Sequence, residues 1–325
     1  MATAIRDLRP AETPALVECV RRCYGETYPE ADFYEPDLLA GAIRDGRLAS
    51  KVAVTDAGRV VGHLATRWAF PGDVVAEAVG GIVDPEHRGQ GWLRRLGAEM
   101  FAQHRERRLA GLHLFATSAH LRSQKLILAG SGTATGVLLG HIPAGTRYEA
   151  IDHDFGDRRI AAVVFYQPLG EMPPLRVFPG DVHGRRLAPL YARAELPREL
   201  AEPDPRAGLL PGSADYDARQ RIATLRLGNG VIALGTLLRT PAVSRAEVVY
   251  AEVPLADPRA AATLEALGRR RFGFGALLPG SERSERLRLQ RVRSSRIAPE
   301  RIRTGSDEVA ALVDDALAEQ RAVGG

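Results

Sequence analysis

The chain has 325 residues, a formal net charge of +4 and a pI of about 9.3, with 45% hydrophobic and 26% charged residues. This length predicts two domains, and the composition is typical of a globular chain that buries a hydrophobic core. No apolar run is long enough to cross a membrane, and the N-terminal segment lacks the apolar core of a signal peptide. We therefore expect a cytoplasmic protein with no membrane partner.

The positive charge does not indicate a nucleic-acid surface. The 44 Lys and Arg residues are nearly balanced by 40 Asp and Glu, and in the basic stretch 286–292 the arginines alternate with apolar residues, as on an ordinary strand. We expect no nucleic-acid partner. Cys19 and Cys23 lie one helical turn apart. This spacing favours buried thiols on a helix over a redox or metal pair, and we expect no metal.

The N-terminal half alternates between helix and strand patterns. Thr13 and Pro14 predict a helix start with Thr13 as its cap. A hairpin over 48–69 with its turn at 55–59, a strand over 73–84 and a helix from residue 92 follow. Next come a strand over 111–118, a helix over 120–130 and a strand over 134–143.

The C-terminal half begins near residue 152 and repeats these patterns. A helix is predicted over 182–196, a loop over 197–217 because of its Pro, Gly and acidic content, and a hairpin over 221–238 around Gly228-Asn229-Gly230. Residues 246–279 are predicted to form a strand, a helix and a second strand in that order. A last strand over 284–292 and a helix over 306–320 complete the prediction.

The stretch "GGIVDPEHRGQGWLRRLG", residues 80–97, places two glycines between a strand and a helix. It is not a P-loop, because no Lys follows the second glycine, and it lacks the third glycine of a dinucleotide fingerprint. A strand, a proline and then Arg-Gly-x-Gly entering a helix would instead turn successive N–H groups toward an anion. Arg88 adds a positive charge, so this segment suits a diphosphate; a plain tight turn is the alternative.

The segment "VDPEHRGQGWLRRL" resembles motif A of the GCN5-related N-acetyltransferase (GNAT) superfamily, Arg/Gln-x-x-Gly-x-Gly/Ala. Arg88 and Gly91 match its first and fourth positions, while Leu93 stands where the pattern has a small residue. The resemblance implies an α+β fold, a mixed, mostly antiparallel sheet flanked by helices. Residues 116–143 resemble the later half of certain GNAT domains, although the helix here carries no Tyr to protonate a departing thiolate.

Residues 247–280 also resemble a GNAT half, with a Gly-Phe turn at Gly273-Phe274 and no preceding Arg-x-x-Gly-x-Gly. We therefore expect two domains in tandem: a GNAT domain at 1–150 and a degenerate GNAT-like domain with a C-terminal helix at 151–325. An unrelated α+β domain remains the alternative for the second half.

The resemblance implies acetyl-CoA or another acyl-CoA as co-substrate. Backbone groups of Ile82 and Val83 would pair with the pantetheine arm, and Ser123 would contact the pantetheine or the thiol. The diphosphate would be held by the segment Arg88, Gly89, Gln90, Gly91, Trp92 and Leu93.

Glu77 is the best candidate for the general base, as the one ionisable residue on its strand before Asp84; a solvent-facing Glu is the alternative. His120 is a second candidate, and Trp68, Tyr24 and Tyr34 could line an acceptor pocket or pack in the core. The predicted reaction is direct transfer of a short acyl group to a small-molecule amine, by a monomer or homodimer. The alternative is a non-catalytic acyl-CoA-binding regulatory or assembly protein.

Overall fold

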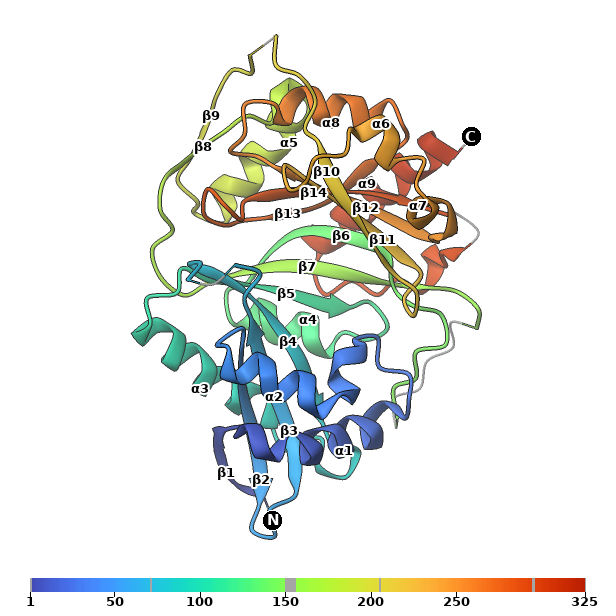
Figure 1. Cartoon of the computed structure of the whole chain (residues 1–325). Coiled ribbons are helices and arrows are strands. Elements are labelled where there is room, and N and C mark those ends of the chain that lie inside the picture. Colours follow the sequence, from blue (N-terminus) through green and yellow to red (C-terminus); the bar gives the residue numbers. More distant parts are fainter. Residues whose placement is uncertain (1, 71, 150–155, 205, 294–295, 325) are drawn as a thin grey trace. The chain divides into compact units, whose positions relative to one another are not determined.

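The computed structural model describes residues 2–70, 72–149, 156–204, 206–293 and 296–324. It divides into two compact units. Unit 1 comprises Met1–Phe115, Gly145–Asp154 and Leu169–Glu171, and unit 2 comprises Ala116–Ala144, Phe155–Pro168 and Met172–Gly325. The domain boundary predicted at 150/151 lies outside the described residues. Both units combine helices with strands that pair mostly antiparallel, so the predicted α+β class is confirmed (Figure 1).

In unit 1 the strands lie side by side in the order β1-β2-β3-β4-β5, all antiparallel except the parallel pair β4–β5. The strands are β1 (Ala2–Asp7), β2 (Leu48–Thr55), β3 (Val60–Arg67), β4 (Val75–Val83) and β5 (Gly111–Thr117). The helices are η1 (Pro10–Glu12), α1 (Thr13–Tyr24), η2 (Ala31–Tyr34), α2 (Pro36–Arg44), η3 (Pro85–His87) and α3 (Trp92–Glu106).

The two faces of the unit 1 strands are covered by different helices. Val52 and Val54 of β2 pack in one buried cluster with Leu16 of α1, whereas Ala53 between them packs with Trp92 of α3. Successive side chains of a strand point to opposite faces, so α1 and α3 lie on opposite sides of these strands. Cys19 and Cys23 are buried on α1, as predicted.

In unit 2 the strands follow the order β7-β6-β13-β14-β12-β11-β10, with β11–β12 the parallel pair. The strands are β6 (Thr133–Ile142), β7 (Ile160–Pro168), β10 (Gly212–Asp217), β11 (Ile222–Leu227), β12 (Val248–Pro254), β13 (Gly273–Leu278) and β14 (Arg286–Val292); β8 (Leu175–Val177) and β9 (Arg198–Leu200) form a separate pair. The helices are α4 (Arg122–Ala129), α5 (Gly180–Arg193), α6 (Leu234–Leu237), α7 (Pro241–Arg245), α8 (Ala260–Gly268), η5 (Pro299–Arg301) and α9 (Asp307–Gly324).

Three local predictions were wrong. The hairpin around Gly228-Asn229-Gly230 does not form, because β11 pairs with the preceding strand β10 and the chain after the turn enters α6. Correspondingly, the predicted loop at 197–217 contains β9 and β10. At the start of α1, Thr13 is the first helical residue rather than the cap, and its hydroxyl donates to the carbonyl of Pro10 at 3.0 Å.

Candidate active site

Strand β4 runs past its partner β5. The β4–β5 ladder of the described residues extends from the pair Val75–Gly111 to the pair Ala78–Leu114, but β4 continues to Val83. Beyond Ala78, the backbone on that side of β4 therefore has no β5 partner in the described chain. An extended ligand with amide groups could hydrogen-bond to this part of the strand as an additional strand would.

A β-bulge interrupts β4 within this open stretch. Ala65 of β3 pairs with Val79 and His63 pairs with Ile82, so Gly80 and Gly81 both lie opposite Leu64. Gly80 has φ +63°, and a Cβ on it would lie 2.6 Å from the ring of Phe33. Glycine is thus required at residue 80, both for its backbone conformation and for space.

The segment after β4 presents unpaired backbone amides. Gly89 and Gly91 have φ +79° and +74°, and Gly91 caps α3. The amides from Gly89 to Arg94 donate no recorded hydrogen bond in the described residues; the first to do so is that of Arg95, to the carbonyl of Gly91 at 3.1 Å. Amides at a helix N-terminus bind anions, so this turn is a candidate diphosphate site.

The side chains of Arg88 and Trp92 have hydrogen-bond partners other than these amides. Nε of Arg88 donates to the carbonyl of Val83 at 3.1 Å, and its guanidinium also bonds the carbonyl of Glu149. The indole of Trp92 is buried and donates to Oε1 of Gln90 at 3.1 Å.

Leu93 packs against β4, since a Cβ at Gly81 would lie 3.4 Å from its Cδ1. The missing side chain of Gly81 thus accommodates the leucine found where motif A has a small residue. Of the other predicted cofactor residues, Ile82 is buried and Val83 is half-buried. Ser123 lies on α4 in unit 2.

Asp84 anchors the start of this turn. It is 1% exposed, and its Oδ2 accepts from Nε of Arg22 at 2.6 Å and from Arg59 at 2.9 Å. Burial alone would raise its pKa, but the two arginines outweigh burial and lower it. Glu86 and His87 lie close enough to Asp84 to form a metal-like cluster. Because the two guanidiniums already bind Asp84, the cluster serves to fix the turn.

Glu77 lies in a row of charged and polar residues across three strands. It pairs with Arg67 of β3 on one side and with His113 of β5 on the other. Residues paired across neighbouring strands place their side chains on the same face of the sheet. Glu77 is half-buried and one residue before the point where β4 and β5 separate. A carboxylate here could receive a proton from a nucleophile bound in the opening.

Two carboxylates of the segment after α1 form ion pairs with Arg67 of this row. Arg67 binds Oε2 of Glu30 at 2.7 Å and Oδ2 of Asp32 at 2.8 Å. Burial, together with the negative charge of Glu77, raises the pKa of Glu30 to about 7, although Arg67 opposes this shift. Tyr28 packs edge-on against Phe33 with ring centroids 5.5 Å apart, so aromatic rings adjoin the carboxylates.

We expect the raised pKa of Glu30 to appear in the pH dependence of stability. A carboxyl with a pKa of about 7 when folded and 4.5 when unfolded stabilises the fold below pH 4.5 and loses this contribution as the pH rises through 7. Glu30→Gln should remove this decline, about 1–2 kcal/mol after allowance for partial exposure. Urea unfolding of both proteins from pH 4.5 to 8 measures the difference; parallel curves would contradict it.

Residues 4–125 resemble a known family. A family model described as an acetyltransferase (GNAT) domain matches them. No curated protein matches the chain.

Solved structures similar to the chain include three acetyltransferases. The ribosomal-protein-S18-alanine N-acetyltransferase of Escherichia coli is 16% identical, with a TM-score of 0.41, over 53% of this chain and 97% of its own. A GNAT superfamily phosphinothricin acetyltransferase of Sinorhizobium meliloti, in complex with AcCoA, is 19% identical, with a TM-score of 0.42, over 53% and 90%. The ribosomal-protein-alanine N-acetyltransferase of Brucella melitensis is 21% identical, with a TM-score of 0.40, over 51% and 99%.

The C-terminal half repeats an order of elements found in the N-terminal half. The parallel pair β11–β12 is followed by α8 and the antiparallel pair β13–β14, just as β4–β5 is followed by α4 and the pair β6–β7. However, β11 and β12 remain paired up to Arg226–Glu252, one residue before β11 ends. Glu252 is further bound by Arg288 at 2.6 Å.

Two amides of the turn after β11 donate to backbone carbonyls of unit 2. The amide of Gly228 donates to the carbonyl of Pro211 at 2.8 Å, and that of Ile232 to the carbonyl of Gly212 at 3.1 Å. A Cβ on Gly230 would lie 2.5 Å from the oxygen of Gly212, so this turn packs tightly on β10. The described residues of this turn therefore leave no space for a phosphate between them and β10.

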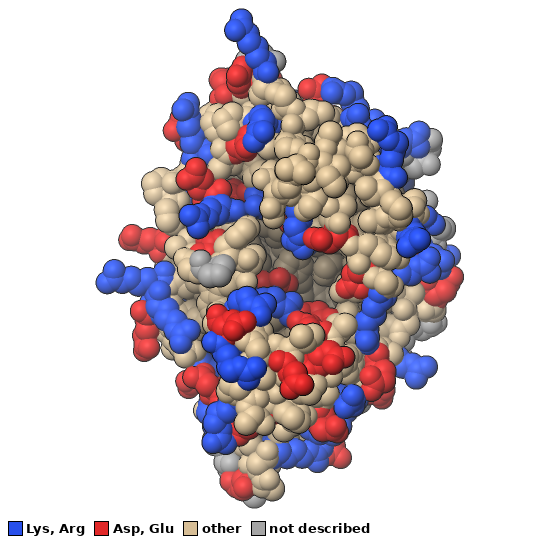
Figure 2. Space-filling view, viewed as in Figure 1, with Lys and Arg blue, Asp and Glu red and all other residues tan. Residues whose placement is uncertain are grey.

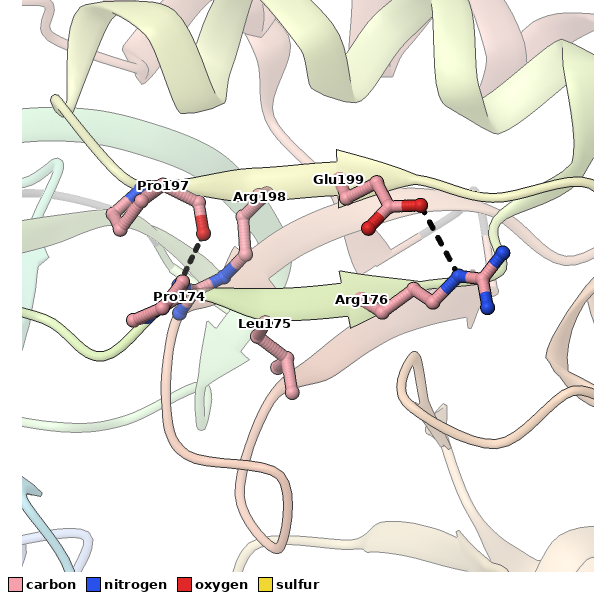
Figure 3. Close-up of a pocket in the computed structure, with 6 residues that line it drawn as sticks. All are labelled: Pro174, Leu175, Arg176, Pro197, Arg198 and Glu199. Carbon is pink, nitrogen blue, oxygen red and sulfur yellow. Dashed lines mark hydrogen bonds and ion pairs between the residues drawn. The ribbon is translucent and has the colours of Figure 1, made fainter.

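A cavity of about 420 Å³ lies beside β8 and β9 in unit 2 (Figure 3). It is lined by Pro174, Leu175, Arg176, Pro197, Arg198 and Glu199. All five N–H groups of Arg198 are bonded within the protein, and Arg176 pairs with Glu199 at 3.2 Å. The charged groups of this cavity thus have partners already, and it is not part of the GNAT domain.

The aromatic residues predicted to line an acceptor pocket pack against other residues of the protein. Tyr34 is buried and its hydroxyl donates to the carbonyl of Gly25 at 2.8 Å, while Trp68 packs against His104. Tyr24 packs against Tyr28 with the two rings tilted and their centroids 4.7 Å apart. His120 lies in unit 2, outside the row that contains Glu77.

Arg67 and His113 of the GNAT domain were not predicted as site residues. The sequence shows which residues alternate along each strand, but it does not show that these three residues lie opposite one another on neighbouring strands.

No helix in the described residues is long and apolar enough to span a membrane. On the face shown in Figure 2, basic and acidic side chains are interspersed.

Proposed function

We propose that the protein transfers an acetyl or other short acyl group from acyl-CoA to the amine of a small molecule. The observation that supports this most is the series of unbonded amides from Gly89 to Arg94, directly after a strand whose last residues have no β5 partner. The amides suit the diphosphate, and the open strand suits the amide-containing arm of the cofactor. The family model over residues 4–125 agrees with both.

Glu77 is the residue proposed to accept the proton of the attacking amine. It lies where β4 and β5 separate, with Arg67 on one side and His113 on the other. The amine attacks the thioester carbonyl directly in a ternary complex, and a β4 amide stabilises the oxyanion. The helix α4, Arg122–Ala129, contains no Tyr, so water is proposed to protonate the leaving thiolate.

The second candidate function is a non-catalytic acyl-CoA-binding protein. It is favoured by the guanidinium of Arg88, which bonds the carbonyls of Val83 and Glu149 rather than pointing into the amide turn. Titration calorimetry with acetyl-CoA, followed by assay of thiol release with a panel of amines, separates the two. Binding with turnover supports the transferase, and binding without turnover on any amine supports the alternative. No binding at millimolar acetyl-CoA would exclude both.

We also propose that residues 151–325 form a degenerate second GNAT-like domain that binds no acyl-CoA. The β11–β12 ladder, which runs to the pair Arg226–Glu252, and the bonded amides of Gly228 and Ile232 support this. The same titration should therefore give one acetyl-CoA per chain. Gly91→Val, which forces a β-branched residue into φ +74°, should abolish binding, whereas a remaining second site would contradict the prediction.

A further inference from the structure

His63 of β3 is fully buried and makes two hydrogen bonds that define its protonation. Its Nδ1 lies 2.6 Å from the carbonyl oxygen of Gly80 and its Nε2 lies 2.7 Å from Oγ of Ser50. Burial lowers the pKa of His63 to about 4, so the ring is neutral near pH 7. A carbonyl oxygen can only accept, so Nδ1 carries the hydrogen and Nε2 accepts from the Ser50 hydroxyl.

This bond determines the orientation of the peptide between Gly80 and Gly81. No cis peptide occurs in the described chain, and in a trans peptide the C=O and the following N–H point in opposite directions. The Gly80 carbonyl points toward the ring of His63, so the Gly81 amide points away from that ring. Gly81 is exposed and lies in the part of β4 that has no β5 partner.

At the bulge, the orientation of the Gly80–Gly81 peptide depends on contacts with His63. Gly80 has φ +63°, a conformation outside the regular strand, and a Cβ there would lie 2.8 Å from Cε1 of His63. The histidine therefore packs directly on the glycine whose carbonyl it binds. Phe33 also packs against Gly80, and its ring lies edge-on to the imidazole of His63 with ring centroids 5.5 Å apart. The ring and its two hydrogen bonds hold one peptide in one orientation.

We propose that His63, supported by Ser50, is a positioning residue that aims the Gly81 amide at the thioester carbonyl oxygen. The inference rests on the proposed acyltransferase function. When the amine nitrogen bonds to the carbonyl carbon, the negative charge that develops on the oxygen is stabilised by the Gly81 N–H. Collapse then breaks the C–S bond, the amine proton passes to Glu77, and the thiolate leaves and takes a proton from water. A donor fixed before the reaction stabilises this oxyanion without reorganisation.

Two substitutions of His63 separate the hydrogen bond from packing. In His63→Asn the side-chain amide can still donate to Gly80, but the ring is lost. In His63→Phe the ring remains and the donor is lost. We expect His63→Phe to lower kcat about 10²- to 10³-fold, the effect of misplacing an oxyanion donor. We expect His63→Asn to retain kcat within about ten-fold although its Tm falls, because the ring leaves a cavity.

His104 provides the matched control. It is also fully buried in unit 1, with Nε2 2.7 Å from Oγ1 of Thr66, and burial likewise lowers its pKa to about 4. His104→Phe should lower Tm but leave kcat unchanged. Acetyl-CoA affinity, measured by calorimetry, should stay within about three-fold in all variants, since the diphosphate turn is untouched.

The outcomes distinguish the inference from the function on which it rests. A parental kcat in His63→Phe, or kcat losses that simply follow Tm in the histidine variants, would overturn the role of His63 while leaving the acyltransferase intact. A parent protein that binds acetyl-CoA but acetylates no amine would overturn the proposed function, and the inference with it.

Discussion

Glu77→Gln is expected to lower kcat about 10²- to 10⁴-fold, the range that a positioned general base contributes. The substitution keeps the size of the side chain and removes its negative charge and its ability to accept a proton. Because the attacking amine must give up a proton to a base, the residual rate should rise with pH, as hydroxide or free amine replaces Glu77. Steady-state kinetics from pH 6 to 10 with acetyl-CoA and an accepted amine measure this.

The control is Glu99→Gln, since Glu99 is an exposed carboxylate on α3 of the same unit. It should keep the parental kcat at every pH. Equal turnover of Glu77→Gln and the parent over the whole range would remove Glu77 from the role of base. In that case His113, its partner on β5, would be the next residue to replace.

Glu285→Gln should reduce the free energy of unfolding of unit 2 by about 3–5 kcal/mol, the cost of leaving a buried charge without its partner. Glu285 and Arg198 form an ion pair at 2.9 Å in which both side chains are 0% exposed. Oε1 of Glu285 also accepts from the hydroxyl of Tyr191 at 2.8 Å, and Oε2 accepts from the amide of Gly280 at 2.6 Å. Glutamine would leave the Arg198 charge uncompensated and turn an N–H₂ group toward a donor.

Glu199→Gln provides the control for this measurement. Glu199 pairs with Arg176 on the neighbouring strand, but their side chains are 70% and 63% exposed (Figure 3). An exposed pair of this kind contributes less than about 1 kcal/mol. Thermal or urea unfolding should therefore distinguish the two variants clearly. Equal stability of the two would show that the Glu285–Arg198 pair does not stabilise unit 2.

The turn over residues 85–91 was predictable because its signals are local. Pro85 follows an apolar strand pattern and restricts its own φ, and Gly89 and Gly91 permit the positive φ of the turn. The row containing Arg67, Glu77 and His113 was only partly predictable. Alternation along each strand determines which residues share a face, whereas the register between strands depends on the bulge at Gly80.

The wrong hairpin at residues 221–238 has the same cause. Gly228-Asn229-Gly230 does form a turn, and both glycines have positive φ as a hairpin would require. However, both sides of β11 are occupied, one by β10, which directly precedes it in the chain, and the other by β12. The residues after the turn therefore cannot pair with β11, and the chain enters α6 instead. Glu30 was not singled out, because only its contact with Arg67 distinguishes it from the acids around it.

Strand β6 is antiparallel to β13 as well as to β7, and the meeting point is tight: a Cβ on Gly136 would lie 2.2 Å from the carbonyl oxygen of Gly275. Both strands belong to one polypeptide, so their association is independent of protein concentration. It also covers a sheet edge that would otherwise be exposed to pairing with foreign strands during folding. A bulkier residue at 136 should therefore expose this edge, and aggregation rather than loss of catalysis would be its first consequence.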